Sequence, residues 1–166
     1  MVNIHSLNGF FFSELRLGTG YSKKAQKRVD AWALNCYPSS NHLKVAYEIK
    51  VYRSDFLNEM KNPKKRQEGL NLSNQFYFVA PTKIIKLPEV PVECGYIEIT
   101  DKNKFKVIKE APVRLCKDPT WLFTSSLARR TAKNEGVDFY HFSDEVINAL
   151  MNTFYNLGFS RDIKYR

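Results

Sequence analysis

Two carboxylates inside otherwise apolar strand-like segments constrain this chain more than any other feature. Residues 29–34 and 45–52 are rich in apolar and β-branched side chains, and residues 38–41 (Pro-Ser-Ser-Asn) between them have the composition of a turn. We therefore predict an antiparallel hairpin. Asp30 lies in its first strand and Glu48 in its second. Because an unpaired buried carboxylate is strongly destabilising, such groups are normally ion-paired or bound to a metal ion.

The hairpin is expected to gather Asp30, Glu48 and Lys50 in one patch. Side chains two residues apart in a strand share a face, so Glu48 and Lys50 should lie side by side. Magnesium prefers one or two carboxylates with waters, and it lowers the pKa of a bound water. A neighbouring lysine can orient that water. The alternative is a surface pair of Glu48 and Lys50, with Asp30 neutralised by Arg28.

Composition restricts the partners. The chain has 26 Lys+Arg against 17 Asp+Glu, a formal net charge of +9, which favours a polyanion: nucleic acid first and an anionic membrane second. No apolar run is long enough to span a bilayer, and we expect no secretory signal. Three scattered cysteines and three scattered histidines disfavour disulfide frameworks and zinc sites. We expect the cytoplasm of a bacterial or phage-infected cell.

The periodicity predicts one mixed α/β (α+β) domain over residues 1–166, with a core at about 10–110 and a helical extension at about 119–160. Besides the hairpin, we expect strands at 76–80, 96–100 and 105–109. We expect helices at 4–17, 55–61 (N-capped by Ser54), 63–72, 121–133 and 143–157. Trp32, Phe76, Phe78, Phe123 and Phe139 are expected in the core. Glu59, Glu68, Asp144 and Glu145 are expected on solvated faces.

With these residues in place, the chain resembles the PD-(D/E)XK nuclease superfamily, the restriction-endonuclease-like fold. Asp30 stands for the first acid, and Glu48-Ile49-Lys50 for the (D/E)XK strand. Residues 46–56 (AYEIKVYRSDF) and 74–81 (NQFYFVAP) are more narrowly similar to MmcB-type DNA-repair proteins and related phage nucleases.

The resemblance implies a restriction-endonuclease-like αβββαβ core, here with C-terminal helices, and a nuclease dependent on Mg²⁺ or Mn²⁺. It implies that Asp30 and Glu48 are metal ligands, that the Ile49 carbonyl is a further ligand, and that Lys50 positions the water. Such enzymes often place a glutamate on the first helix, for which Glu14 is the candidate. They also tend to carry a Gln or Lys on the crossover helix, for which Lys65 and Gln67 are the candidates.

Basic and aromatic residues near these strands are the expected contacts with DNA. The phosphate backbone is the expected target, with little direct base readout. Tyr21 is a candidate for stacking on a base. The residues expected at this surface are Lys24, Lys27, Arg28, Tyr52, Arg53, Lys64, Lys65 and Gln67.

The leading hypothesis is a metal-dependent deoxyribonuclease in DNA repair or phage DNA processing, and paired strand cleavage would suit a homodimer. The alternative is a non-catalytic DNA-binding or repair-accessory protein that retains the fold. A protein-interaction module with an acidic partner is the third hypothesis.

Overall fold

The computed structural model describes residues 9–18, 27–100 and 104–134. The chain divides into two compact units, Met1–Ser126 and Leu127–Arg166. The first unit contains the sheet and the candidate site. Of the second, only residues 127–134, the end of the last described helix, are described. The predicted helix at 143–157 and the expected core residue Phe139 lie outside the described residues.

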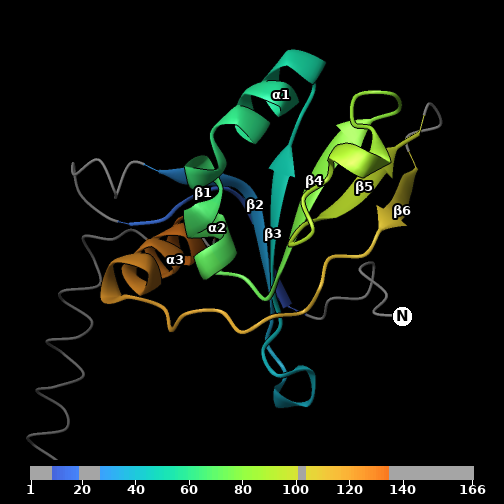
Figure 1. Cartoon of the computed structure of the whole chain (residues 1–166). Coiled ribbons are helices and arrows are strands. Elements are labelled where there is room, and N and C mark those ends of the chain that lie inside the picture. Colours follow the sequence, from blue (N-terminus) through green and yellow to red (C-terminus); the bar gives the residue numbers. More distant parts are fainter. Residues whose placement is uncertain (1–8, 19–26, 101–103, 135–166) are drawn as a thin grey trace, which may run out of the picture. The chain divides into compact units, whose positions relative to one another are not determined.

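A six-stranded mixed sheet forms the first unit (Figure 1). Its strands follow the chain in spatial order: β1 (Gly9–Arg16), β2 (Arg28–Asn35), β3 (Lys44–Ile49), β4 (Gln75–Pro81), β5 (Gly95–Ile99) and β6 (Phe105–Lys109). The first three are antiparallel, β3, β4 and β5 run parallel, and β6 is antiparallel to β5. The predicted hairpin and the mixed α/β class are thus confirmed.

Two helices, α1 (Arg53–Lys61) and α2 (Gln67–Asn71), connect the parallel strands β3 and β4 and lie on one face of the sheet (Figure 1). Phe56 of α1 packs edge-on against Phe78 of β4, with ring centroids 5.4 Å apart. The Trp32 indole nitrogen donates a hydrogen bond to the Leu72 carbonyl at the end of α2 (3.1 Å). These contacts hold the crossover helices on the sheet.

Helix α3 (Trp121–Asn134) begins on the same aromatic layer, because Phe123 packs edge-on against Trp32 at 5.3 Å. Its Ser126 hydroxyl donates to the Arg16 carbonyl of β1. The four expected core aromatics that the structure describes are all buried, namely Trp32, Phe76, Phe78 and Phe123. The sheet therefore buries its aromatic side chains mainly under the helices.

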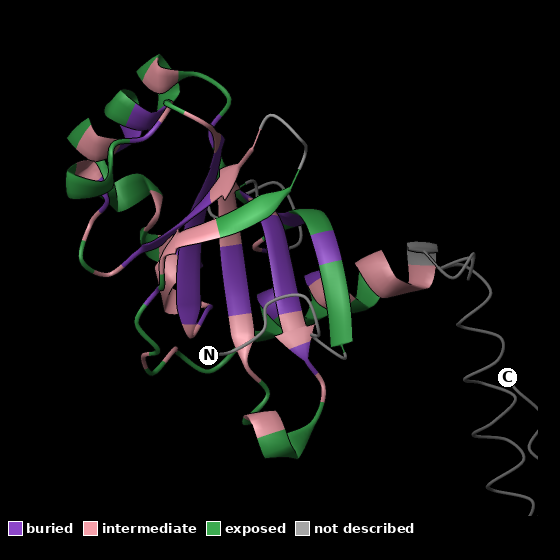
Figure 2. Ribbon diagram, turned by 90° about the vertical axis from the view of Figure 1, so that its right-hand side faces the viewer, coloured by how far each residue is buried: buried purple, intermediate pink, exposed green. Residues whose placement is uncertain are grey.

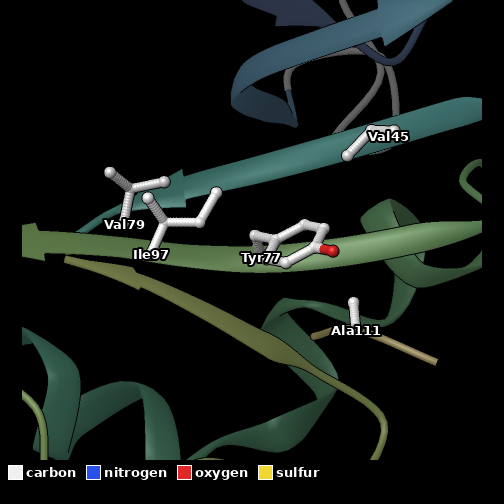
Figure 3. Close-up of a cluster of buried hydrophobic side chains, with 5 residues drawn as sticks. All are labelled: Val45, Tyr77, Val79, Ile97 and Ala111. Carbon is white, nitrogen blue, oxygen red and sulfur yellow. The ribbon is translucent and has the colours of Figure 1, made fainter. Parts of the chain in front are cut away.

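The opposite face of the sheet carries a second apolar cluster of Val45, Tyr77, Val79, Ile97 and Ala111 (Figure 3). No helix among the described residues covers this face (Figure 2). A shallow hollow of about 360 Å³ lies over it, and its lining includes Phe11, Tyr47, Ile49 and Phe105. This hollow is apolar and contains none of the carboxylates singled out in the sequence.

The predicted helix at 4–17 is wrong for its described part, which is strand β1. Residues 9–16 pair with β2 from Gly9 opposite Asn35 to Arg16 opposite Arg28, and only Phe12 and Leu15 of β1 are buried. Backbone hydrogen bonds to β2 take the place of those that a helix would form within itself. Helix α1 also starts at Arg53, with Tyr52 rather than Ser54 at its N-cap. Within the described residues, no helix combines the length and apolar character that crossing a membrane requires.

Candidate active site

Asp30 and Glu48 lie where β2 and β3 cease to pair. The backbone pairing between these strands ends at Ala31 and Tyr47, one residue before each carboxylate. Beyond it, Asp30 Oδ2 accepts a hydrogen bond from the Ile49 amide of β3 at 2.8 Å. This bond fixes the Asp30 side chain across the two strands. The hairpin thus brings the two predicted acids to the same place.

Lys50 extends the site from the end of β3. Its ammonium Nζ lies 2.7 Å from Glu48 Oε1, which confirms that these side chains are neighbours. The same nitrogen lies 3.1 Å from Glu59 Oε2, and the Lys50 side chain is only 4% exposed. The alternative of a surface pair therefore does not hold. Glu48 and Lys50 do pair, but the pair is largely buried, and Lys50 also contacts a second glutamate, Glu59.

Glu59 of α1 is the residue that the sequence reasoning missed. The sequence predicts it on a solvated face, but its side chain is 0% exposed and it also pairs with Lys65, whose Nζ lies 3.3 Å from Oε2. The expectation is wrong because Glu59 lies one helical turn after Phe56, the side chain that anchors α1 to the sheet. The spacing of three residues from Phe56 was the signal available in the sequence.

The charges of the site are not balanced by its own residues. Burial, with the charges of Asp30 and Glu59, raises the pKa of Glu48 against the opposing effect of Lys50. Burial lowers the pKa of Lys50, but the hydrogen bond and charge of Glu48 and those of Glu59 outweigh it, so that this pKa is raised. For Glu48 the main cause is burial, whereas the raised pKa of Lys50 reflects its two glutamate neighbours. Three carboxylates here face two lysines, Lys50 and Lys65.

Glu14 does not lie on a first helix, so that part of the prediction is wrong. It belongs to β1, where its backbone has a positive φ of 47°, and its side chain is 75% exposed. Glu14 Oε2 lies 3.9 Å from an Arg28 guanidinium nitrogen. Arg28 therefore pairs with Glu14, whereas the recorded partner of Asp30 is the Ile49 amide.

The residues expected at a DNA surface differ in how much they are already engaged. Lys27 pairs with Glu68 at 3.6 Å, and Gln67 donates a hydrogen bond to Asn71. Lys64 is exposed beside Lys65 in the 3-10 turn Pro63–Lys65, and Tyr52 is exposed just before α1. Lys24 and Tyr21 lie outside the described residues.

Arg53 is the most firmly engaged of these residues. Its two terminal nitrogens contact the two carboxylate oxygens of Glu89 at 2.6 and 2.9 Å, and one of them also donates to the Ile84 carbonyl. The side chain therefore ties the start of α1 to the loop after β4.

Asp30 and Glu48 supply carboxylate oxygens, the donors that hard divalent cations prefer. No group of three or more His, Cys, Asp or Glu in the described ranges is arranged to hold a metal ion. Magnesium nevertheless needs only one or two carboxylates when waters complete its shell. The second oxygens of Asp30 and Glu48 have no hydrogen-bond partner among the described residues. For Ile49 the structure shows the amide bond to Asp30, and its carbonyl as a ligand stays a prediction.

Comparison with known proteins gives a fold and no function. No family model matches the chain. No curated protein matches it either. Among solved structures, a protein of unknown function from Silicibacter pomeroyi is similar, with a TM-score of 0.54 and 18% sequence identity. The similarity covers 79% of this chain and 82% of that one. Because the identity is only 18%, the likeness is one of fold alone.

Proposed function

We propose that this protein is a metal-dependent nuclease that hydrolyses DNA phosphodiester bonds, in DNA repair or phage DNA processing. The observation that carries the proposal is the convergence of Asp30, Glu48 and the buried Lys50 at the end of one hairpin. Buried titratable groups with shifted pKa values beside one another are typical of functional sites.

The order of the elements supports the proposal. The β1–β2–β3 meander, the crossover through α1 and α2, and the parallel strand β4 agree with the βββαβ part of the restriction-endonuclease-like core that the resemblance implies. The acid–x–lysine segment lies at the end of the third strand of this meander.

In the proposed reaction, Asp30 and Glu48 would hold Mg²⁺ or Mn²⁺. The chemistry that such a cation supplies is withdrawal of charge from the phosphate and a lower pKa for a coordinated water. Lys50 would orient the attacking water and offset negative charge in the transition state. The Ile49 amide keeps the Asp30 carboxylate in place without consuming its second oxygen.

The substrate class follows from charge. A formal net charge of +9 favours a polyanionic backbone. Lys65 pairs with Glu59 at the edge of the proposed site, and Lys64 is exposed beside it in the same 3-10 turn. These two lysines would therefore contact phosphates of the strand to be cut, while the positive surface as a whole would supply affinity that depends on salt.

Cleavage of plasmid, linear and single-stranded DNA with Mg²⁺ or Mn²⁺ tests the proposal. We expect EDTA to abolish activity, and Asp30→Asn and Lys50→Ala each to reduce it by about a hundredfold or more. Asp55→Asn removes an exposed carboxylate of α1 and is the matched control, with activity unchanged. Cleavage that survives both site substitutions would refute the assignment. Salt-sensitive DNA binding without cleavage and without response to EDTA would instead indicate the non-catalytic accessory protein.

A further inference from the structure

Glu59 is a buried carboxylate beside the proposed site and is not one of the proposed metal ligands. Its Oε2 accepts from Lys50 Nζ at 3.1 Å and lies 3.3 Å from Lys65 Nζ. Its other oxygen, Oε1, is buried with no hydrogen-bond partner among the described residues. An unsatisfied buried acceptor is costly, and more so on a charged group. The position of this oxygen beside Lys50 therefore calls for an explanation.

The packing of α1 fixes Glu59 over the end of β3. Phe56, three residues earlier on the same helix face, is fully buried against Phe78. The Glu59 carboxylate reaches Lys50 from this anchored helix, whereas Glu48 reaches the same ammonium from the strand. Lys50 is thus held between two carboxylates that belong to different elements.

Even on its second oxygen, Glu48 would bring a cation close to the Lys50 ammonium. Its Oε1 is at present only 2.7 Å from Lys50 Nζ, the shorter of the two Lys50 contacts. A cation that draws on this carboxylate competes with the positively charged ammonium. Glu59 offers the ammonium an alternative, because it already holds Nζ and has a second oxygen to spare.

We propose that Glu59 is a positioning residue that keeps Lys50 beside the site while releasing Glu48 to the metal ion. This rests on the proposed function, since it requires a divalent cation on Asp30 and Glu48. Lys65 shares Glu59 Oε2 with Lys50 and so weakens the hold of Glu59 on Lys50. Without Glu59, the Lys50 ammonium would keep only Glu48 as a carboxylate partner at the site. It would then compete more strongly with the metal ion for Glu48.

The test is the affinity of the full chain for Mn²⁺ in the absence of DNA, measured from free Mn²⁺ by electron paramagnetic resonance. We expect Glu59→Gln to weaken binding by about tenfold. Lys50→Met removes the competitor, so adding Glu59→Gln to Lys50→Met should change the affinity by no more than about twofold. Glu68→Gln removes a more exposed carboxylate of α2 and is the control, with wild-type affinity.

Two results would overturn this role of Glu59. One is wild-type Mn²⁺ affinity in Glu59→Gln. The other is an equal loss with and without Lys50, which would indicate a long-range effect of charge. If Glu59→Gln does not fold, Lys65→Met serves instead: it should strengthen Mn²⁺ binding when Lys50 is present and have no effect beside Lys50→Met. An unchanged affinity in that variant, or an equal gain in both backgrounds, also overturns the role.

The two proposals fail in distinguishable ways. A wild-type chain that binds no Mn²⁺ contradicts the proposed metal-dependent function, and the role of Glu59 with it. A wild-type chain whose Mn²⁺ binding does not depend on Glu59 contradicts only the positioning role.

Discussion

A lysine held between two carboxylates is the side-chain arrangement on which the site depends. Lys50 loses most of its hydration in this position, yet the two glutamates keep it charged, since together they outweigh the effect of burial on its pKa. A charged, ordered ammonium is suited to positioning a water or a phosphate oxygen. For Glu48, burial raises the pKa, and the charges of Asp30 and Glu59 add to this effect against the opposing effect of Lys50.

A second ion pair should contribute to stability in a pH-dependent way. The Arg53 hydrogen bonds hold the pKa of Glu89 below its usual range. The carboxylate form is thus favoured in the folded state, so the stabilisation is present above the ordinary glutamate pKa and is lost as pH falls through the lowered one. We expect the melting temperature of Glu89→Gln to lie below that of the wild type near neutral pH and to converge with it in acid. Parallel pH profiles for the two proteins would contradict this account.

The sequence predicts individual residues of the site unevenly. Asp30 and Glu48 stand out because a carboxylate is unexpected in a strand segment whose neighbouring side chains are apolar. Glu59 does not stand out, because most helices carry glutamates on their solvated side, and residues 53–61 have only a weak apolar stripe. Arg53 was expected to contact DNA, and its partner Glu89, 36 residues further on, was not recognisable from spacing.

Among the elements, α1 matters most, because it carries Glu59 and is anchored chiefly by one aromatic side chain. Phe56→Ala should lower the free energy of unfolding by about 3 to 5 kcal/mol, since Phe56 is fully buried and contacts Phe78. Leu57, its neighbour, is 39% exposed, so Leu57→Ala is the matched control and should cost much less. Urea unfolding curves measure both values. Equal losses for the two variants would show that α1 is not anchored through Phe56.

Prediction of elements succeeded where local pattern and pairing agree. The hairpin of β2 and β3, the strand β4 and the pair β5 and β6 follow from apolar runs separated by turn residues. The sequence predicts a helix at β1 because Phe10 to Phe12 and Leu15, with Leu17 just beyond the strand, also fit a helical spacing. Its pairing with β2 is a long-range contact, and this decides its conformation.

At the scale of the whole molecule, the excess of positive charge and the small acidic site have separate roles in the proposed function. We expect DNA affinity to fall linearly with salt on logarithmic axes. Lys64→Ala should reduce that slope by about one, as expected for a lysine that contacts a phosphate. Lys106→Ala, on β6 at the far end of the strand order from β1, is the control and should leave the slope unchanged. Fluorescence anisotropy with labelled DNA measures these slopes, and identical values for all three proteins would remove Lys64 from the DNA surface.

The most direct test of the account is the anomalous diffraction of crystals soaked in Mn²⁺. We expect a manganese peak within coordination distance of both Asp30 and Glu48, with Lys50 retained by Glu59. Each of these carboxylates has an oxygen without a hydrogen-bond partner among the described residues, and these two oxygens are the expected ligands. Crystals that take up manganese only elsewhere, or show no peak between these two carboxylates at saturating Mn²⁺, would contradict the proposed metal site.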